Sequence, residues 1–384
     1  MQYRTFGKLD WKVSALGFGA MRLPTSDGDP RSNNIDEREA MRIIRCAIDE
    51  GINYIDTAYV YHGGNSELLV GKALQDGYRD KVRIATKSPI WLIRADDDFD
   101  RFLNEQLSRL QTDHIDFYLM HGLNQKTWRN VVLSRNLLEK AEVAKRDGRI
   151  RDLGFSFHDG YSAFPEILSG FDWSFCQIQY NYMDVENQAG TQGLKLAAEK
   201  GMAVIVMEPL LGGRLANPPA PIRQILDESG TKLSPVDLAL HWIWDQPEVT
   251  TILSGMSSLE QVRTNVASAC ASRVSSFATA DFELVGQMRT RYRERSAIPC
   301  TKCNYCMPCP TGVNIPRNFE LYNDAYMHED FPEARFVYKT FVPEPERASE
   351  CIECHVCEDL CPQKIPISDW MPKLAKTLGP QNSA

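Results

Sequence analysis

The stretch GINYIDTAYVYHGGNSELLVGKAL, residues 51–74, decides the fold because it joins two different hydrophobic periodicities. Residues 52–58 form a short apolar run typical of a buried strand, and residues 66–75 carry apolar side chains at helical spacing. A buried strand followed directly by an amphipathic helix is the building unit of a parallel α/β sheet. A fold based on this unit requires its repetition along the chain.

The same strand–helix unit recurs through the first two thirds of the sequence, after a hairpin expected in residues 3–13. Eight units in a row predict a (β/α)8 TIM barrel, for which about 250 residues is typical. Strands are expected at 14–20, 52–58, 82–89, 114–122, 150–156, 174–181, 202–209 and 249–255. Helices are expected at 35–51, 66–75, 98–110, 135–148, 161–169, 191–201, 234–247 and 258–269.

An open, doubly wound sheet is the alternative architecture for alternating strands and helices. Such a sheet commonly carries a G-x-G-x-x-G turn after its first strand. No such motif follows residues 14–20, and GGNSELLVG (63–71) follows the second strand and lacks the spacing. The barrel is therefore favoured, with its active site at the C-terminal ends of the strands.

Composition limits the classes of function. The chain has 384 residues, 43% hydrophobic and 24% charged, which suffices for a barrel and a small second domain. A formal net charge of −8 argues against a general nucleic-acid or anionic-membrane binder. The first residues lack an apolar signal core, and no apolar run reaches the length of a membrane span. We therefore expect a soluble, cytoplasmic protein that binds neither nucleic acid nor membrane.

Four titratable side chains follow three successive strands at the expected active-site face. Asp56 and Tyr61 follow the second strand, Lys87 the third and His121 the fourth. A tyrosine is a weak acid with a pKa of about 10, and a neighbouring lysine lowers that value. An aspartate can hold the lysine, and a histidine can orient a carbonyl that the tyrosine protonates. Each residue alone also has a structural explanation, but their grouping favours catalysis.

The segments 51–74, IATKSP (84–89) and IDFYLMHG (115–122) resemble the aldo-keto reductase superfamily, over roughly residues 1–270. The resemblance implies a (β/α)8 barrel that binds NADH or NADPH and reduces a small-molecule aldehyde or ketone. It implies that Tyr61 is the general acid, that Lys87 and Asp56 tune it, and that His121 orients the carbonyl.

The resemblance also implies contacts with the dinucleotide. Gln179 matches a glutamine that contacts the nicotinamide amide, and Met207 lies where many relatives stack an aromatic ring. Ser156 matches the serine of a G-x-S-N-F motif whose asparagine is Phe157 here, and His158 is the candidate replacement. The expected contacts with the phosphates and adenosine come from two loops and the helix that follows: Leu210, Gly212, Gly213, Gly255, Met256, Ser257, Gln261 and Asn265.

The choice between NADH and NADPH is open at this level. Many relatives that prefer NADPH carry a basic residue at or near positions 255–258, because arginine suits a 2′-phosphate. This chain has none there, and Arg263 is the nearest.

Eight of the eleven cysteines lie in two short runs near the C-terminus. Residues 351–362, CIECHVCEDLCP, have the C-x2-C-x2-C-x3-C-P spacing of bacterial ferredoxins, and residues 300–310, CTKCNYCMPCP, are one residue shorter. Two [4Fe–4S] clusters are expected, with the fourth cysteine of each run serving the other cluster. Zinc is the competing metal. One set would be Cys300, Cys303, Cys306 and Cys361, and the other Cys351, Cys354, Cys357 and Cys309.

The expected domains are the barrel (1–276), a connecting helix (277–299) and a small, mainly α-helical, ferredoxin-like iron–sulfur domain (300–384). Residues 311–350 are too apolar for a flexible linker and are expected to form helices. Residues 373–384 are expected to be a fraying terminus.

The role of the clusters leaves three interpretations, because a nicotinamide transfers two electrons as hydride whereas a cluster transfers one. The protein is a carbonyl reductase whose clusters are structural, an electron-transfer protein that links a ferredoxin-like partner to a second redox cofactor, or a non-catalytic redox-sensing module. The four titratable residues argue against the third interpretation, and of the other two the first is preferred. Trp91 and Trp128 lie on loops where they either line a substrate pocket or pack against the cluster domain.

Overall fold

A computed structural model describes residues 1–380 and contains a closed barrel of eight parallel strands. The strand order is β10-β3-β4-β5-β6-β7-β8-β9. Pairing of Ile252 in the last strand with Leu16 in the first closes the barrel and excludes the open sheet. The strands are β3 (Leu16–Gly19), β4 (Tyr54–Asp56), β5 (Arg83–Ser88), β6 (Ile115–Leu123), β7 (Ile150–Phe157), β8 (Phe175–Gln179), β9 (Ala203–Met207) and β10 (Thr251–Ser254).

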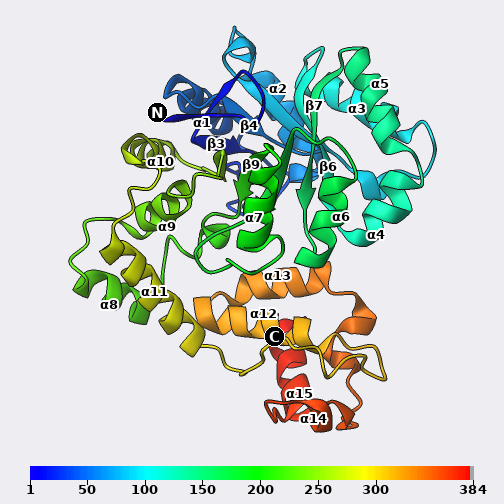
Figure 1. The fold of residues 1–384 in the computed structure, drawn as a ribbon, viewed down its shortest axis with the longest axis vertical. Coiled ribbons are helices and arrows are strands. Elements are labelled where there is room, and N and C mark those ends of the chain that lie inside the picture. Colours follow the sequence, from blue (N-terminus) through cyan, green and yellow to red (C-terminus); the bar gives the residue numbers. More distant parts are fainter. Residues whose placement is uncertain (381–384) are drawn as a thin grey trace. The chain divides into compact units, whose positions relative to one another are not determined.

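Helices surround the barrel, one after each strand, as the sequence predicted (Figure 1). Their starts follow from local chemistry: Asp36 caps α1 through the N–H of Glu39, and Ser234 and Asp237 form a capping box on α9. The helices are α1 (Glu37–Asp49), α2 (Asn65–Ala73), α3 (Asp98–Leu110), α5 (Leu137–Arg146), α6 (Phe164–Ser169), α7 (Gly190–Glu199), α9 (Pro235–Trp244) and α10 (Leu259–Ala271).

The N-terminal end of the barrel is filled by an aromatic cluster. The expected hairpin is present as β1 (Tyr3–Thr5) and β2 (Lys12–Ser14), and it places Phe6 against Phe117 with ring centroids 4.4 Å apart. Tyr54, Phe175 and other apolar residues near the starts of the strands complete this cluster. The polar strand ends therefore lie at the opposite, C-terminal end of the barrel.

The chain divides into two compact units. The first comprises Met1–Leu215 and Leu233–Thr279, and the second Ala216–Lys232 and the described residues from Ala280 onward. The second unit thus includes α8 (Ala220–Glu228), a helix that the sequence analysis did not anticipate. The boundaries expected at 276 and 299 stay a prediction. No helix in residues 1–380 has both the length and the apolar character to cross a membrane.

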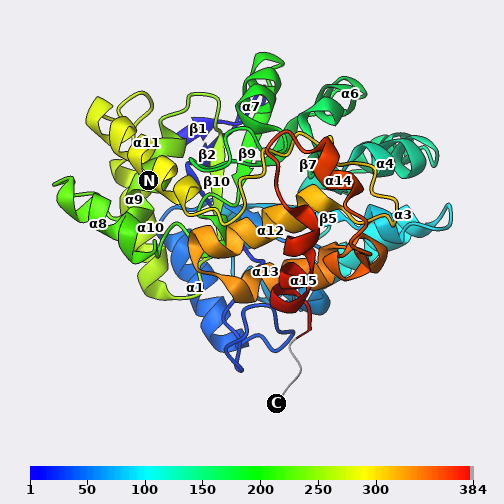
Figure 2. The same ribbon diagram turned by 90° about the horizontal axis from the view of Figure 1, so that it is seen from below.

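The second unit is helical and has its own hydrophobic core. Its helices are α11 (Thr279–Glu294), α12 (Ile315–His328), α13 (Phe331–Phe341), α14 (Val356–Leu360) and α15 (Ile367–Leu378). Helices α12, α13 and α15 lie side by side (Figure 2). The buried residues of their common core include Phe319, Tyr338 and Met371. Residues 311–350 therefore form helices, as expected.

The fraying expected from residue 373 is wrong for residues 373–378. Helix α15 continues to Leu378, because Leu374 and Leu378 are buried in the core of the second unit. Gly379 and Pro380 follow the end of the helix, and residues 381–384, which complete that expectation, lie outside the described residues.

Candidate active site and cluster sites

Three adjacent strands bring the four expected catalytic residues to one end of the barrel. Asp56 is the last residue of β4, Lys87 lies near the end of β5, and His121 lies near the end of β6. Tyr61 begins the short 3-10 turn η1 (Tyr61–Gly64) that connects β4 to α2. The sequence therefore located the neighbourhood of these groups correctly, since the C-terminal ends of neighbouring parallel strands converge.

Lys87 is the centre of the group. Its ammonium Nζ lies 2.6 Å from Asp56 Oδ1, 2.8 Å from the Thr57 carbonyl oxygen and 3.3 Å from Tyr61 Oη. The side chains of Lys87 and Asp56 are 1% and 3% exposed. A buried ammonium with three acceptors has one fixed position, and this position directs one of its N–H bonds at the tyrosine oxygen.

Burial dominates the electrostatics of the tyrosine. It raises the pKa of Tyr61 above its usual value, and the Lys87 ammonium opposes this shift without reversing it. Burial alone would lower the pKa of Lys87, but Asp56 and Tyr61 together raise it. The sequence-based expectation of a lowered tyrosine pKa is thus wrong in its net direction. At neutral pH Tyr61 is a protonated phenol beside a charged lysine, which is the state a general acid needs.

His121 faces Tyr61 as a neutral imidazole. The two rings meet edge to face with centroids 6.2 Å apart. Burial, with the nearby Lys87 charge, lowers the pKa of His121 well below its usual value. His121 Nδ1 and Asp56 Oδ2 are buried without a hydrogen-bond partner within residues 1–380. Unpaired buried polar atoms at one end of the barrel are typical of a site that is completed by a ligand.

The two tryptophans have different environments. Trp91, in the 3-10 turn η3 (Ile90–Leu92) after β5, is 38% exposed, and its ring lies 4.9 Å from the His121 ring. Trp128 is 2% exposed and packs on Trp173 with centroids 6.1 Å apart. Trp91 is therefore positioned beside the group of four expected catalytic residues, whereas Trp128 belongs to the packing of the barrel unit.

The turn that carries Tyr61 is held from both sides. His62 Nε2 accepts the Leu23 N–H at 3.2 Å, so Nδ1 carries the proton and donates to the Ser32 carbonyl at 2.6 Å. Residues 62–64 all have positive φ, which explains the paired glycines that follow His62. The turn is thereby fixed against the loop that follows β3.

A buried carboxylate supports the same region from α2. Glu67 accepts hydrogen bonds from the Thr86 hydroxyl and the Gln106 amide, both at 2.6 Å, and from Arg109 at 3.2 Å. The Gln106 amide also donates to the Lys87 carbonyl oxygen at 3.1 Å. This network links α2 and α3 to the backbone of Lys87, and the sequence analysis did not identify it.

The residues expected near the nicotinamide lie at or just beyond the ends of β7, β8 and β9. Some of their polar side chains already form hydrogen bonds within the protein. Ser156 Oγ accepts the Gly122 N–H at 2.8 Å, and His158 is exposed just beyond β7. Gln179 donates to Asp184 at 2.6 Å, and its carbonyl oxygen accepts from Gln188 at 3.0 Å. Both polar ends of Gln179 therefore have partners within the protein, and its role in cofactor binding stays a prediction.

Gln177 is an additional candidate that the sequence analysis missed. It lies two residues before Gln179 on β8, so the two side chains share the inner face of the strand. Gln177 pairs in register with Ser156, is 2% exposed, and has a buried Oε1 without a partner within residues 1–380. An unpaired buried amide oxygen suits the NH2 group of a carboxamide better than an amide already paired at both ends.

The loops expected to hold the phosphates adjoin an arginine from a distant part of the sequence. Leu210 precedes the 3-10 turn η6 (Leu211–Gly213), in which Gly212 and Gly213 have φ of 67° and 97°. Arg22, after β3, donates to the Gly212 carbonyl at 3.4 Å, and a Cβ built at Gly255 would lie 3.4–3.8 Å from its aliphatic stem. Arg22 thus lies between the two loops.

The residues expected on the adenosine side form a small polar group at the start of α10. The Ser257 N–H donates to Gln261 Oε1 at 2.7 Å, and Asn265 donates to Ser254 Oγ at 3.1 Å. Met256 between them is fully buried, so its side chain is part of the core and only its backbone is available to a ligand. These contacts stay predictions.

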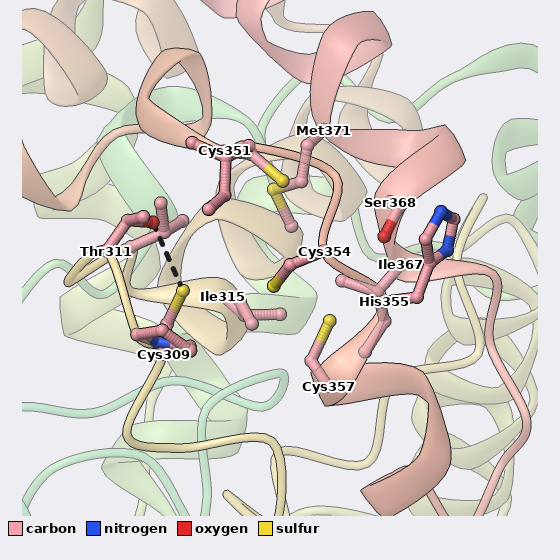
Figure 3. Close-up of a pocket in the computed structure, with 13 residues that line it drawn as sticks. Cys309, Thr311, Ile315, Cys351, Cys354, His355, Cys357, Ile367, Ser368 and Met371 are labelled. Atoms are coloured by element: carbon pink, nitrogen blue, oxygen red, sulfur yellow. Dashed lines mark hydrogen bonds between the residues drawn. The ribbon is translucent and has the colours of Figure 1, made fainter.

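The cysteines line two separate cavities in the second unit, each with about 330 Å³ of empty space that partly opens to solvent. Apolar side chains complete each wall, among them Ile315 and Ile367, which contribute to both (Figure 3). The first cavity is lined by Cys300, Cys303, Cys306 and Cys361, and the second by Cys309, Cys351, Cys354 and Cys357.

This arrangement fits a pair of iron–sulfur clusters. Four thiolates around one mostly apolar cavity are the donor set of a [4Fe–4S] cluster, and the fourth cysteine of each run lies at the other run's cavity. Within residues 1–380, no group of three or more histidine, cysteine or acidic side chains is arranged around a single metal ion.

Comparisons with known proteins match the barrel and the cysteine-rich region to two different families. Residues 15–278 match the aldo/keto reductase family, and residues 299–365 match a 4Fe-4S dicluster domain. The fold and site define an oxidoreductase barrel followed by an iron–sulfur domain. The chain belongs to the aldo/keto reductase family.

Individual relatives are distant. The uncharacterized oxidoreductase YqkF of Bacillus subtilis is 26% identical over 72% of this chain and 93% of its own length. The NADH-specific methylglyoxal reductase of Escherichia coli is 29% identical over 68% of this chain and 91% of its own length. The structure of aldo-keto reductase AKR11C1 from Bacillus halodurans in its holo form is similar, with a TM-score of 0.62 and 28% identity, over 75% of this chain and 96% of that one.

Proposed function

We propose that this protein reduces an aldehyde or ketone with NADH or NADPH, and that Tyr61 is the general acid. The observation that carries the proposal is the contact of the buried Lys87 ammonium with both Asp56 and Tyr61. A bound NADH or NADPH supplies the hydride that is added to the carbonyl carbon. The protein's own task is then to orient the carbonyl and to deliver one proton to its oxygen.

Each residue of the group has a defined part in that task. His121, as a neutral imidazole, donates a hydrogen bond to the carbonyl oxygen and turns it toward Tyr61. Tyr61 gives its phenolic proton to this oxygen, and the Lys87 charge stabilises the phenolate that results. Asp56 holds Lys87 in position and compensates its charge.

The dinucleotide is proposed to bind along the ends of β7 to β10. Gln177 or Gln179 receives the carboxamide, Met207 packs against the ring, and the loops around Gly212 and Gly255 approach the phosphates with Arg22 between them. The NADH specificity in the name of the E. coli relative, together with the lack of a basic residue at 255–258, supports NADH.

The second unit is proposed to hold two [4Fe–4S] clusters. The two cavities with four cysteines each support this number. Electron exchange with a one-electron carrier is a second candidate function of this unit, because Cys303 and Cys354, one in each set, are exposed.

Replacement of Tyr61 by phenylalanine tests the proposed chemistry. The variant keeps the ring but loses the proton, so we expect kcat for NADH- or NADPH-dependent reduction of methylglyoxal or another aldehyde to fall about 100- to 10,000-fold. Cofactor binding, measured by quenching of protein fluorescence, should be unchanged.

Tyr59 provides a matched control in the same loop. Its hydroxyl donates to Glu105 at 3.0 Å, outside the catalytic group, so Tyr59→Phe removes a hydroxyl without touching Lys87. If Tyr61→Phe retains the activity of Tyr59→Phe, Tyr61 is not the general acid.

A further inference from the structure

The two cysteine runs end in the same Cys-Pro pair but are followed by different residues. Each ends in a Cys-Pro pair, and the next residue is Thr311 after Cys309-Pro310 but Gln363 after Cys361-Pro362. Cys309 lines the second cavity and Cys361 the first. Thr311 and Gln363 therefore occupy corresponding places, one at each proposed cluster.

Thr311 makes a contact that Gln363 does not. The Thr311 hydroxyl oxygen lies 3.5 Å from Cys309 Sγ, and Figure 3 shows the two groups facing one another at the cavity wall. A cysteine sulfur that ligates iron carries no proton, so in a loaded site only the hydroxyl can donate. Within the described residues, Gln363 makes no hydrogen bond to Cys361, although it lines the first cavity.

Two other features of the two sites match. Each set contains one exposed, one buried and two half-buried cysteines, so solvent access to the sulfurs is similar. The Glu353 N–H donates to Cys351 Sγ at 3.4 Å, and the backbone N–H of Lys302 stands in the same relation to Cys300. Cys309 also accepts hydrogen bonds from the backbone of Thr311, Gly312 and Val313. The Thr311 hydroxyl adds to these a side-chain hydrogen bond that is not found at Cys361 within the described residues.

Charges near the sites act through solvent and are weaker. Lys302 beside the first site forms an ion pair with Glu320, and Glu353 beside the second site is exposed. Exposed and paired charges are screened by water and salt, whereas a hydrogen bond to a ligand sulfur acts at contact distance.

A hydrogen bond to a cluster sulfur stabilises the reduced form of the cluster, which is the more negative one, and therefore raises its reduction potential. We propose that Thr311 sets the potential of the second cluster above that of the first, so that a single electron shared between the two sites resides at the Cys309 side. This inference rests on the two clusters of the proposed function.

The test is an anaerobic redox titration of the complete, cluster-loaded protein, followed by electron paramagnetic resonance. The wild type should show two separate midpoints. Thr311→Val removes the hydroxyl at nearly constant volume and should move the higher midpoint to a more negative potential while leaving the lower one in place. Thr311→Ser keeps the hydroxyl and should stay close to the wild type.

Gln363→Thr makes the converse change at the first cluster and should raise the lower midpoint. If Thr311→Val loses iron, Gln363→Thr still tests whether a hydroxyl at this place raises the midpoint potential. A lower midpoint that does not move in Gln363→Thr then overturns the proposal. Coincident midpoints in the wild type, or midpoints that Thr311→Val leaves unchanged, overturn it as well. If the wild type itself holds no iron or sulfide, the proposed function of this unit has failed instead.

Discussion

Lys87 and Asp56 form a buried ion pair on which the stability of the barrel unit is expected to depend. Both side chains are buried, and each supplies the charge that the other needs, since Lys87 Nζ lies 2.6 Å from Asp56 Oδ1. A buried charge that loses its partner keeps the full cost of its desolvation. Each member of the pair is therefore expected to need the other for stability, in addition to its proposed part in catalysis.

Lys87→Met should destabilise the barrel unit by about 3–5 kcal/mol, because it leaves the Asp56 carboxylate buried and unpaired. The double variant Asp56→Asn/Lys87→Met removes both charges and should recover most of that loss without recovering activity. Urea unfolding, monitored by tryptophan fluorescence, measures the stability of the single and the double variant. A single variant as stable as the double one would show that Asp56 is not charged in the folded protein.

The pH dependence of carbonyl reduction follows from the same residues. Burial raises the pKa of Tyr61, so the proton-donating phenol persists at neutral pH and is lost as the pH rises through its folded pKa. The pKa of His121 is lowered well below 6.5, so His121 remains neutral there. We expect kcat/KM to be flat from about pH 6.5 to 9 and to fall only above about pH 10. An inflection near pH 6.5 would contradict the neutral histidine.

At the scale of elements, the turn after β4 determines where Tyr61 lies. Gly64, between η1 and α2, has a φ of 96°, and a Cβ there would lie 3.0 Å from Arg109 Nη1. Arg109 in turn binds Glu67 and the Tyr59 carbonyl. The glycine is therefore needed both for its backbone conformation and for the close approach of α3.

Gly64→Ala should destabilise the protein by at least about 1 kcal/mol and lower kcat, because the turn can relax only by moving Tyr61. Gly77→Ala is the matched control, since Gly77 also has a positive φ, of 80°, but nothing lies within 4 Å of a Cβ built there. Thermal unfolding and steady-state kinetics compare the two. Equal kcat values in both variants would show that the turn does not position the catalytic tyrosine.

At the scale of the whole molecule, the two units have separate cores. Four cluster cysteines, two from each proposed set, pack against the core of the second unit, and Cys357 and Cys361 are buried in it. Metal binding at such a site is coupled to folding. Loss of the clusters should therefore affect the second unit more than the barrel.

Anaerobically purified protein should contain about eight iron and eight sulfide ions per chain, and removal of the iron with a chelator should open residues after 300 to proteolysis. We expect the barrel to keep its Tyr61-dependent reductase activity. Elemental analysis, limited proteolysis and the aldehyde assay measure this. Zinc in place of iron would reject the clusters, and loss of activity together with iron would show that the two units are functionally coupled.

Several features were accessible from the sequence because they depend on local periodicity or spacing. The alternation of strands and helices predicts the barrel. In a barrel, a residue at the C-terminal end of a predicted strand lies on the active-site face. This places Asp56, Tyr61, Lys87 and His121 together without knowledge of any contact. The cysteine spacing likewise predicts which thiols share a site, and the two cavities have that composition.

Other features required the folded chain, because they depend on which distant segments meet and on how much water they exclude. Arg22 reaches Gly255 only when β3 pairs with β10, and Gln177 differs from Gln179 only through the partners that each amide finds. The direction of the Tyr61 pKa shift is set by burial, which no spacing of residues reveals.

The sequence by itself predicted the order of the barrel strands, the grouping of Asp56, Tyr61, Lys87 and His121, and the two sets of cysteines, because periodicity and motif spacing act within short stretches of chain. Only the tertiary structure decided that Trp91 rather than Trp128 lies beside His121, and that the Thr311 hydroxyl faces Cys309. The physical reason is that side-chain environment, unlike strand order, arises from contacts between segments that become neighbours only on folding.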